Sequence, residues 1–334
     1  MKISYVLPKD VLTNEDLEKC YSSPSWTATK IYRKTGIKSR HVAIRERASD
    51  LAREAAEALF AEYEISPSII DFVLLCTQSP DYFLPSTACI LQHQLGIPTS
   101  AGALDFNLGC SGYIYGLAVA KGLLFSGTAK NILLITSETY SRYINPLDRS
   151  TRTVFGDGAA ATYLNLGDID KIGEFVLGTD GSGANNLIVP AGAAAMKCSA
   201  ETLSEDEDSS GNIRSKNDIY MNGPEIFAFT LRTVPELVSK ILSKNSIPSV
   251  DNLDYVVLHQ ANRLVLRTLQ EKLEIPDDKF CVDVEEIGNT VSSTIPIALK
   301  RTIMSQNINF REGAKVLVAG FGVGYSWGGT IIIL

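Results

Sequence analysis

Residues 71–78 read Asp-Phe-Val-Leu-Leu-Cys-Thr-Gln, and residues 254–260 read Asp-Tyr-Val-Val-Leu-His-Gln. Each stretch begins with aspartate and continues as an apolar run of strand length, and the two begin 183 positions apart. Two more pairs follow in the same order at nearly the same spacing: residues 108–110 with 287–289, and residues 131–136 with 315–319. Ordered matches at one spacing predict two copies of one α/β unit.

Apolar runs of strand length alternate with longer helical patterns, which is typical of an α/β fold whose strands are covered on both faces. Strands are expected at 72–77, 132–136, 159–164, 255–259, 315–319 and 330–334. Helices are expected at 49–63, 86–95, 111–126, 224–243, 261–274 and 293–306. The acidic, turn-rich residues 199–217 are expected to form an exposed loop. The repeat divides the chain into halves at 1–166 and 167–334.

The composition excludes several classes of protein. The chain has 334 residues, of which 45% are hydrophobic, and a formal charge of −7. An acidic balance argues against nucleic-acid binding, which needs a basic surface. No run approaches the roughly 18 apolar residues of a membrane span, and acidic residues stand where a signal peptide is apolar, so a soluble, cytoplasmic protein with no membrane partner is expected. Six cysteines without a C-x-x-C pair and three histidines without paired spacing favour reduced thiols and no metal site.

Cys110 is the candidate nucleophile. It lies in Phe-Asn-Leu-Gly-Cys-Ser-Gly-Tyr at 106–113, just before a segment that is apolar on nearly every face and is therefore expected to be buried. A thiol at a helix N-terminus faces the positive end of the helix dipole and unpaired N–H groups, so we expect a lowered pKa. The competing interpretation is a small buried hydrophobic residue, as for most free cysteines. The other five cysteines lack flanking glycine turns, and packing or surface roles are favoured for them.

His259 and Asn289 complete the candidate site. His259 ends an apolar strand where a helix begins, and open α/β sheets place ligands at such edges. If the halves pack about a pseudo-twofold axis, Cys110 and Asn289 are symmetry mates at the interface, and His259 points into the same region. The alternative is that His259 is an ordinary surface or core residue whose hydrogen bonds are satisfied by its neighbours. The glycine-rich residues 320–329 are followed by too few residues for a dinucleotide-binding unit, and backbone N–H groups that face an oxyanion are the better interpretation.

Basic residues gather in parts of this acidic chain. Seven lie between Lys30 and Arg47 against one glutamate, and Arg263 and Arg267 share one helix face. A solvated surface explains such runs equally well. If the basic segments converge, they suit a partner with phosphate or carboxylate groups.

Taken together, these motifs resemble the β-ketoacyl-acyl-carrier-protein synthase III family. The resemblance rests on N-L-G-C-S-G around Cys110, L-H-Q-A-N around His259, G-N-T around Asn289, the run of residues 148–158, and the terminal G-F-G-V-G-Y-S-W-G-G. It implies a thiolase-like fold of two pseudo-symmetric halves in a five-layered α-β-α-β-α sandwich, and a homodimer. It also implies a Cys-His-Asn triad whose oxyanion hole is formed by the backbone N–H groups of Cys110 and Val323.

The same resemblance implies an acyltransferase with no permanently bound cofactor. An acyl thioester, acyl-CoA or acyl-acyl carrier protein, would acylate Cys110, and decarboxylative condensation with malonyl-acyl carrier protein would give a β-ketoacyl thioester. The residues expected to contact substrate, coenzyme A or carrier are Lys34, Arg149, Arg263, Arg267 and, as the gate of the acyl pocket, Leu84.

Departures from the family pattern put the acyl donor in doubt. Where typical members have a tryptophan, an asparagine and an arginine, this chain has Lys30, Pro224 and Leu264. A specialised pathway is therefore open beside bulk fatty-acid initiation. Acyl transfer to an amine or hydroxyl, condensation of two CoA thioesters, and a non-catalytic binding subunit are the alternatives.

Overall fold

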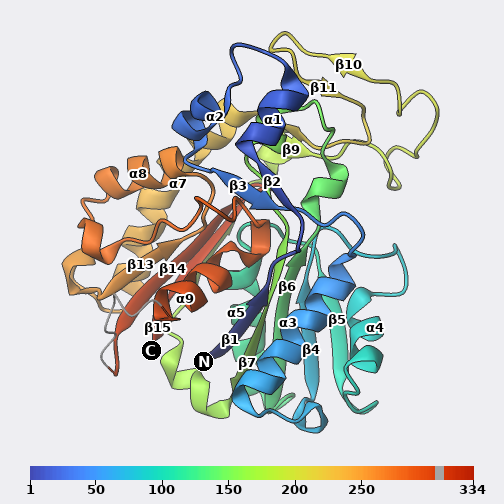
Figure 1. The fold of residues 1–334 in the computed structure, drawn as a ribbon. Coiled ribbons are helices and arrows are strands. Elements are labelled where there is room, and N and C mark those ends of the chain that lie inside the picture. The colour runs from blue at the N-terminus through green and yellow to red at the C-terminus, as the bar shows by residue number, and fades with distance from the viewer. Residues whose placement is uncertain (305–311) are drawn as a thin grey trace.

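The computed structural model describes residues 1–304 and 312–334 and contains two main β-sheets (Figure 1). The first has the order β1-β7-β6-β4-β5 and the second the order β13-β14-β15-β8. The strands of the first sheet are β1 (Lys2–Val6), β7 (Gly158–Asn165), β6 (Asn131–Glu138), β4 (Phe72–Cys76) and β5 (Gly102–Phe106). Those of the second are β13 (Tyr255–Leu258), β14 (Lys315–Gly322), β15 (Ser326–Ile333) and β8 (Val176–Thr179).

The repeat found in the sequence is the repeat of the two sheets. β4 pairs in parallel with β6 and β6 pairs antiparallel with β7, just as β13 pairs in parallel with β14 and β14 antiparallel with β15. The aspartates that open the two repeated stretches also correspond. Asp71 accepts hydrogen bonds from the backbone at Lys130 and Asn131, and Asp254 accepts one from the backbone at Lys315. Each aspartate thus ties the start of one central strand to the start of its neighbour.

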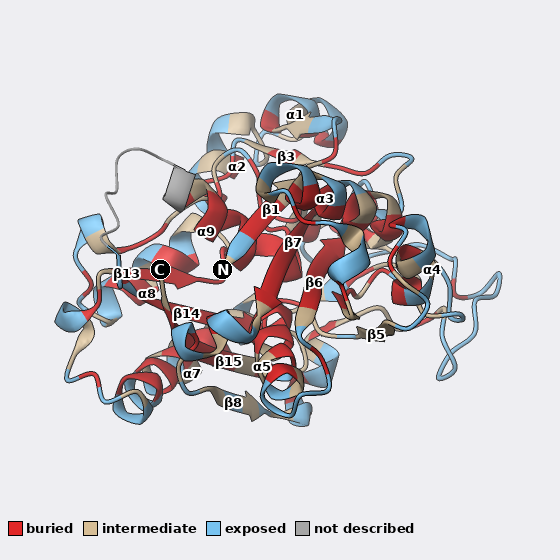
Figure 2. Ribbon diagram, turned by 90° about the horizontal axis from the view of Figure 1, so that it is seen from below, coloured by how far each residue is buried: buried red, intermediate tan, exposed pale blue. Residues whose placement is uncertain are grey.

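Helices cover and separate the sheets. The main ones are α3 (Ala48–Tyr63), α4 (Thr87–Gln94), α5 (Gly112–Phe125), α7 (Gly223–Lys244), α8 (Arg263–Lys272) and α9 (Thr294–Met304). α3 and α4 pack on the first sheet, α7 packs on the second with α8 against it, and both α5 and α9 touch strands of both sheets. The order is therefore helix, sheet, helix, sheet, helix, and Figure 2 shows the central strands β6, β7 and β14 buried, whereas β5 and β8 are less so.

The central helix α5 follows from its composition. Its sequence, GYIYGLAVAKGLLF, has one charged residue, Lys121, and that ammonium donates to the backbone oxygen of Ile172 at 2.5 Å. A helix without a polar face is stable only where apolar surface surrounds it. It therefore lies between the two sheets, with its first residues beside the candidate nucleophile.

Smaller elements lie around the end of the molecule where Figure 1 shows α1, α2 and β10. They are β2 (Val11–Thr13), α1 (Asn14–Tyr21), α2 (Ala28–Thr35), β3 (Ser39–His41), α6 (Arg149–Arg152), β9 (Leu187–Ile188), β10 (Asp206–Glu207), β11 (Ile213–Arg214) and β12 (Tyr220–Met221). The expectation of a plain exposed loop over 199–217 is wrong in part. Most of it is exposed, but β10 pairs with β11, and Thr202 and Asn212 are buried.

The other sequence expectations differ from the structure mainly at their ends. The helix expected at 293–306 is α9, and its expected residues 305–306 lie outside the described part of the chain. The glycine-rich residues 320–329 form the end of β14, the turn at 323–325 and the start of β15. β1, β5 and β8 were not expected from the sequence, because they are short and, in β5 and β8, have no fully buried residue.

Candidate active site

Cys110 lies between the end of β5 and the start of α5, directly before Ser111, the N-cap of that helix. Its side chain is buried, and the β14–β15 hairpin packs against it. A Cβ atom on Gly322 would lie 2.9 Å from the Cβ and 3.0 Å from the Sγ of Cys110, so the hairpin can approach this closely only with glycine there. The hydroxyls of Ser111 and Ser326 share a hydrogen bond of 2.6 Å, which ties the hairpin to the helix start.

The environment of the Cys110 thiol favours the neutral form. The backbone N–H groups of Cys110 and Val323 face the sulfur and lower its pKa, as expected, but burial outweighs them and, with the charge of Glu138, raises the pKa to about 12. The expectation of a lowered thiol pKa is therefore wrong for the free protein. The reason is desolvation, which the position at a helix N-terminus does not offset. Thiolate formation accordingly needs a nearby group that accepts the proton.

His259 follows β13 and lines the same cavity as Cys110. It is buried, and burial lowers the pKa of its imidazole to about 3, so the ring is neutral. Nδ1 lies 2.7 Å from the Oγ1 of Thr294, whose hydroxyl donates to the backbone oxygen of Val291 at 3.1 Å. We therefore assign the proton to Nδ1, since the hydroxyl oxygen accepts there. The lone pair of Nε2 is then available as a base.

Asn289 is held in one orientation by its neighbours. Its backbone pairs with the segment before β7: Asn289 N–H donates to Val154, and Gly156 N–H donates to Asn289, at 3.0 and 2.9 Å. Its side-chain Oδ1 accepts from the backbone N–H of Val291 at 2.9 Å. The amide nitrogen Nδ2 therefore turns toward His259, 3.5 Å from Nε2. A donor and a proton acceptor thus lie side by side.

The three residues line one cavity of about 310 Å³. The rest of its wall is largely apolar, with Phe155, Phe227 and Phe321 among the lining residues. Phe321 meets the imidazole of His259 edge-on, with ring centroids 5.7 Å apart. Charge and hydrogen-bond interactions are strong in such water-poor surroundings. The cavity therefore unites a thiol, a neutral imidazole and an amide donor, which suits nucleophilic attack on a carbonyl group.

A second cavity, of about 930 Å³, lies against the same hairpin. Val323 and Leu187 line it, and Leu187 lines the first cavity as well. Gln78, Asn107 and Tyr140 give it a partly polar wall.

The residues expected to contact substrate, coenzyme A or carrier are more widely spread than the three residues of the smaller cavity. Arg263 opens α8 between Asn262 and Leu264, which both line the smaller cavity, but its guanidinium is held by Tyr32 and Glu285. Arg267 is paired with Asp277 at 2.5 Å, and Lys34 lies 4.5 Å from the ring centroid of Trp26.

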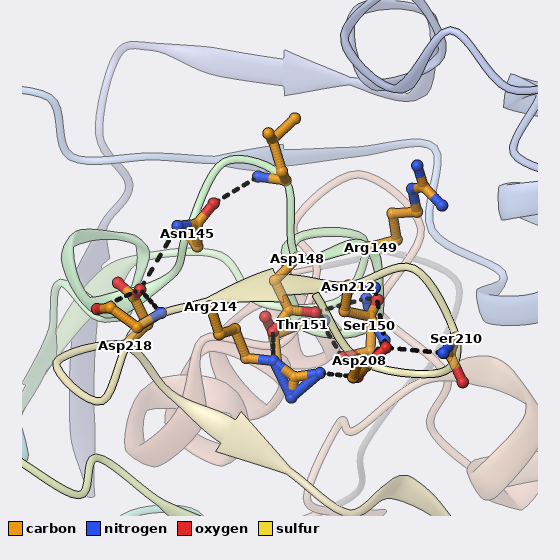
Figure 3. Close-up of polar contacts among 12 residues, drawn as sticks. Asn145, Asp148, Arg149, Ser150, Thr151, Asp208, Ser210, Asn212, Arg214 and Asp218 are labelled. Atoms are coloured by element: carbon orange, nitrogen blue, oxygen red, sulfur yellow. Dashed lines mark hydrogen bonds and ion pairs between the residues drawn. The ribbon is translucent and has the colours of Figure 1, made fainter. Parts of the chain in front are cut away.

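Arg149 begins α6, and Leu84 lies on the surface. Arg149 lies 5.8 Å from the ring centroid of Tyr21. Figure 3 shows its side chain pointing away from the ion pair between Asp148 and Arg214, which fixes the β10–β11 hairpin to α6. Leu84 is 82% exposed and lines neither of the two cavities described above.

The basic segment 30–47 carries less free charge than its composition suggests. Arg40 is fully buried and donates to Asn14 and the backbone of Thr153, while Lys38 and Arg47 are paired with Glu285 and Asp50. The segment therefore offers an anionic partner less positive charge than its sequence suggests. Part of its positive charge is instead buried or paired with acidic side chains of the same chain.

Two residues of the site have roles that the sequence analysis missed. Thr294 fixes the tautomer of His259, and Glu138, at the end of β6, is buried beside Cys110. The signal for Glu138 was present, because a carboxylate at the end of an apolar strand has to find partners when it is buried. The sequence contained no such signal for Thr294, since nothing in it places this residue against His259.

The described residues contain no helix long and apolar enough to cross a membrane, and no cluster of three or more His, Cys, Asp or Glu side chains that could hold a metal ion.

The chain is similar in sequence and in fold to known proteins. Family models described as "3-Oxoacyl-[acyl-carrier-protein (ACP)] synthase III" and its C-terminal part match residues 104–181 and 243–334. A "Beta-ketoacyl-[acyl-carrier-protein] synthase III" of Campylobacter fetus is 36% identical, covering 99% of this chain and 97% of the relative. A crystal structure described as "3-oxoacyl-(acyl-carrier-protein) synthase III" superposes with a TM-score of 0.95 at 51% identity, covering 99% and 98% of the two chains. A "Priming beta-Ketosynthase from the R1128 Polyketide Biosynthetic Pathway" has a TM-score of 0.86 at 27% identity, with 100% and 95% covered.

Proposed function

The chain belongs to the 3-oxoacyl-[acyl-carrier-protein] synthase III family, and on that premise we propose how its residues divide the reaction among them. The enzyme is an acyltransferase with the thiolase fold. It transfers an acyl group from a thioester and condenses it with malonyl-acyl carrier protein, which loses carbon dioxide and yields a β-ketoacyl thioester; no permanently bound cofactor is needed. In our proposal, Cys110 carries the acyl group, and His259 and Asn289 act on the malonyl group.

The first half-reaction is attack by Cys110. The Nε2 lone pair of His259 takes the thiol proton, and the sulfur attacks the acyl carbonyl carbon. The backbone N–H groups of Cys110 and Val323, which already face the sulfur, stabilise the resulting oxyanion. The tetrahedral intermediate collapses, the thiolate of the donor leaves and takes a proton from solvent, and the acyl group remains on Cys110.

The second half-reaction is decarboxylation and carbon–carbon bond formation. His259, now protonated at Nε2, and Nδ2 of Asn289 donate hydrogen bonds to the malonyl thioester oxygen. They stabilise the enolate that forms as carbon dioxide leaves. The enolate carbon attacks the acyl carbon, the bond to sulfur breaks, and the Cys110 thiolate recovers its proton from His259.

The observation that carries this proposal is the convergence of Cys110, His259 and Asn289 on one buried cavity. Intact-mass spectrometry with a panel of acyl-CoA and acyl-carrier-protein donors tests it. We expect one acyl adduct, lost in Cys110→Ser, and carbon dioxide release when malonyl-acyl carrier protein is added. A protein that stays unmodified across the panel would favour a binding subunit. Product formation without carbon dioxide would favour transfer to an amine or hydroxyl, or condensation of two CoA thioesters.

We propose further that the acyl donor is larger than acetyl and belongs to a specialised pathway. The 930 Å³ cavity beside Val323 supports this, as does the likeness to a priming ketosynthase of a polyketide biosynthetic pathway. Initial rates with acyl thioesters of increasing length test the idea. It fails if acetyl-CoA is the best donor.

We also propose a homodimer in the cytoplasm. β5 is an edge strand with Leu104 exposed on it, and Tyr82, Phe83 and Leu84 are exposed nearby in sequence. An uncovered edge with apolar side chains favours pairing with another chain. Since Leu84 lies outside both described cavities of its own chain, it would gate the acyl pocket of the second copy. Light scattering with Leu104→Asp tests the dimer, which this variant should weaken.

Carrier docking and the division into halves complete the proposal. Arg263 and Arg267 on α8, with Lys34 and Arg149, would contact the acidic carrier or coenzyme A at the cavity mouth.

The boundary between the halves would lie at 166/167, since the strands of the first sheet come before it and those of the second after it.

A further inference from the structure

Glu138 is a buried carboxyl group beside the site that the reaction described above does not use. It ends β6, and its side chain is fully buried. Its Oε2 accepts from Gln78 N–H at 3.0 Å and from the Ser79 hydroxyl at 3.2 Å. Its Oε1 is bonded to the Ser292 hydroxyl at 2.7 Å. Among the described residues, no basic side chain forms an ion pair with it.

The first of these bonds leads to the nucleophile. Gln78 is held by Glu138 through its backbone and by the hydroxyl of Tyr140 through its side chain, at 2.6 Å. Its Oε1 lies against the backbone of Gly109: a Cβ atom there would be 2.5 Å from that oxygen and 2.7 Å from a methyl carbon of Val323. Gln78 therefore packs against Gly109, the residue before Cys110. Val323, one of the two proposed oxyanion donors, packs against the same glycine.

The bond to Ser292 leads to the other half of the site. Ser292 lies in the short 3-10 turn Val291–Ser293, between Asn289 and Thr294. Asn289 is oriented by the first residue of this turn, and Thr294, just after it, fixes the imidazole of His259. Glu138 is thus joined on one side to the Cys110 segment of the first half, and on the other to the Asn289–Thr294 segment of the second.

We propose that Glu138 is a positioning residue: in its neutral form it holds the Cys110 segment and the Asn289–Thr294 segment in register, and its ionisation opposes formation of the Cys110 thiolate. This inference rests on the roles given above to Cys110 and Asn289. A neutral carboxyl keeps both links, since Oε1 still accepts from the Ser292 hydroxyl and Oε2 from Gln78 N–H when the group carries a proton.

The charges around Glu138 agree with a neutral carboxyl. Burial is the main reason that its pKa is raised to about 8, and the charge of Asp157 adds to this effect. Its negative charge in turn raises the pKa of the Cys110 thiol. The titratable groups that face it from the surrounding elements are Cys76, Cys110, Tyr140, Tyr143 and Asp157. None of these is a cation, so nothing among them offsets a charge on Glu138, and an anion there would destabilise a thiolate nearby.

The test uses two variants of the full-length protein. Glu138→Gln keeps the neutral shape and an oxygen that can accept from Ser292, but it does not ionise. Ser292→Ala keeps the carboxyl and removes the link to the Asn289 segment. Peptide-resolved mass spectrometry follows alkylation of Cys110 by iodoacetamide, without any substrate, from about pH 6.5 to 9.5. Circular dichroism and melting temperature establish that both variants are folded.

For Glu138→Gln, we expect wild-type alkylation of Cys110 near pH 6.5 and about three- to tenfold faster alkylation near pH 9.5, where the wild-type carboxylate is charged. For Ser292→Ala, we expect the wild-type alkylation profile but about tenfold slower condensation, measured as carbon dioxide release from malonyl-acyl carrier protein. A rate ratio for Glu138→Gln that does not change with pH, or condensation in Ser292→Ala at the wild-type rate, would overturn the proposal.

The two readouts separate this inference from the proposed function. If no thioester acylates Cys110, the assignment of the nucleophile fails. The alkylation profile still decides whether Glu138 controls the thiol, because iodoacetamide requires no catalytic turnover.

Discussion

Thr294→Val tests the assignment of the His259 tautomer. Thr294 Oγ1 accepts from Nδ1 of the buried imidazole at 2.7 Å, and valine has nearly the same shape without the oxygen. The variant leaves a buried N–H without its acceptor, which costs about 1–3 kcal/mol. At about 1.4 kcal/mol per factor of ten, the loss corresponds to a rate decrease of about 5- to 150-fold if it falls on the reacting state.

The rate of acylation by an acyl thioester, followed by intact mass, is the assay. We expect it to fall because a ring that is no longer held can move its proton to Nε2, where it blocks acceptance of the thiol proton. Melting temperature should fall as well, since the same hydrogen bond stabilises the folded state.

Thr290→Val is the matched control. Thr290 is also buried near Asn289, and its hydroxyl has no hydrogen-bond partner among the described residues. Exchanging this hydroxyl for a methyl group should leave the acylation rate unchanged. Wild-type acylation in Thr294→Val, or an equal loss in both variants, would refute the assignment of the tautomer.

Three further predictions follow from the same geometry. Gly322→Ala should lower acylation at least about 100-fold, as measured by intact mass, because its Cβ atom would lie within 3.0 Å of Cys110 Sγ; wild-type rates would show that the hairpin can move. His259→Ala should acylate slowly at pH 7 and faster as pH rises, since solvent must then take the proton of a thiol whose pKa is about 12; a flat profile of rate against pH would contradict the role of base. The folded-state pKa of Glu138 is raised to about 8 from 4.5, so its contribution to stability is complete below about pH 4.5 and is lost as pH rises toward 8. Urea unfolding should therefore show a smaller loss of stability over this range in Glu138→Gln than in the wild type, and parallel curves would contradict the neutral carboxyl.

The sequence by itself determined the architecture of the molecule. The two aspartate-led apolar runs are β4 and β13, and the strands matched with them, β6 and β14, have the same pairing in their own sheets. Such elements are predictable because alternation, apolar length and turn residues act locally. The meeting of Cys110, His259 and Asn289 in one cavity was also predictable from the sequence, since each lies next to a recognisable strand or helix end.

Only the tertiary structure decided the electrostatic state of the site. The Cys110 thiol has a raised pKa although it lies at a helix N-terminus, because segments distant in sequence remove water from it. Glu138 meets Ser292 across 154 positions of the chain, and Arg40 is buried against Thr153 instead of serving the surface. Desolvation and long-range hydrogen bonds depend on which surfaces meet after folding. Local sequence patterns specify the elements and their order, but they carry no record of what each side chain faces.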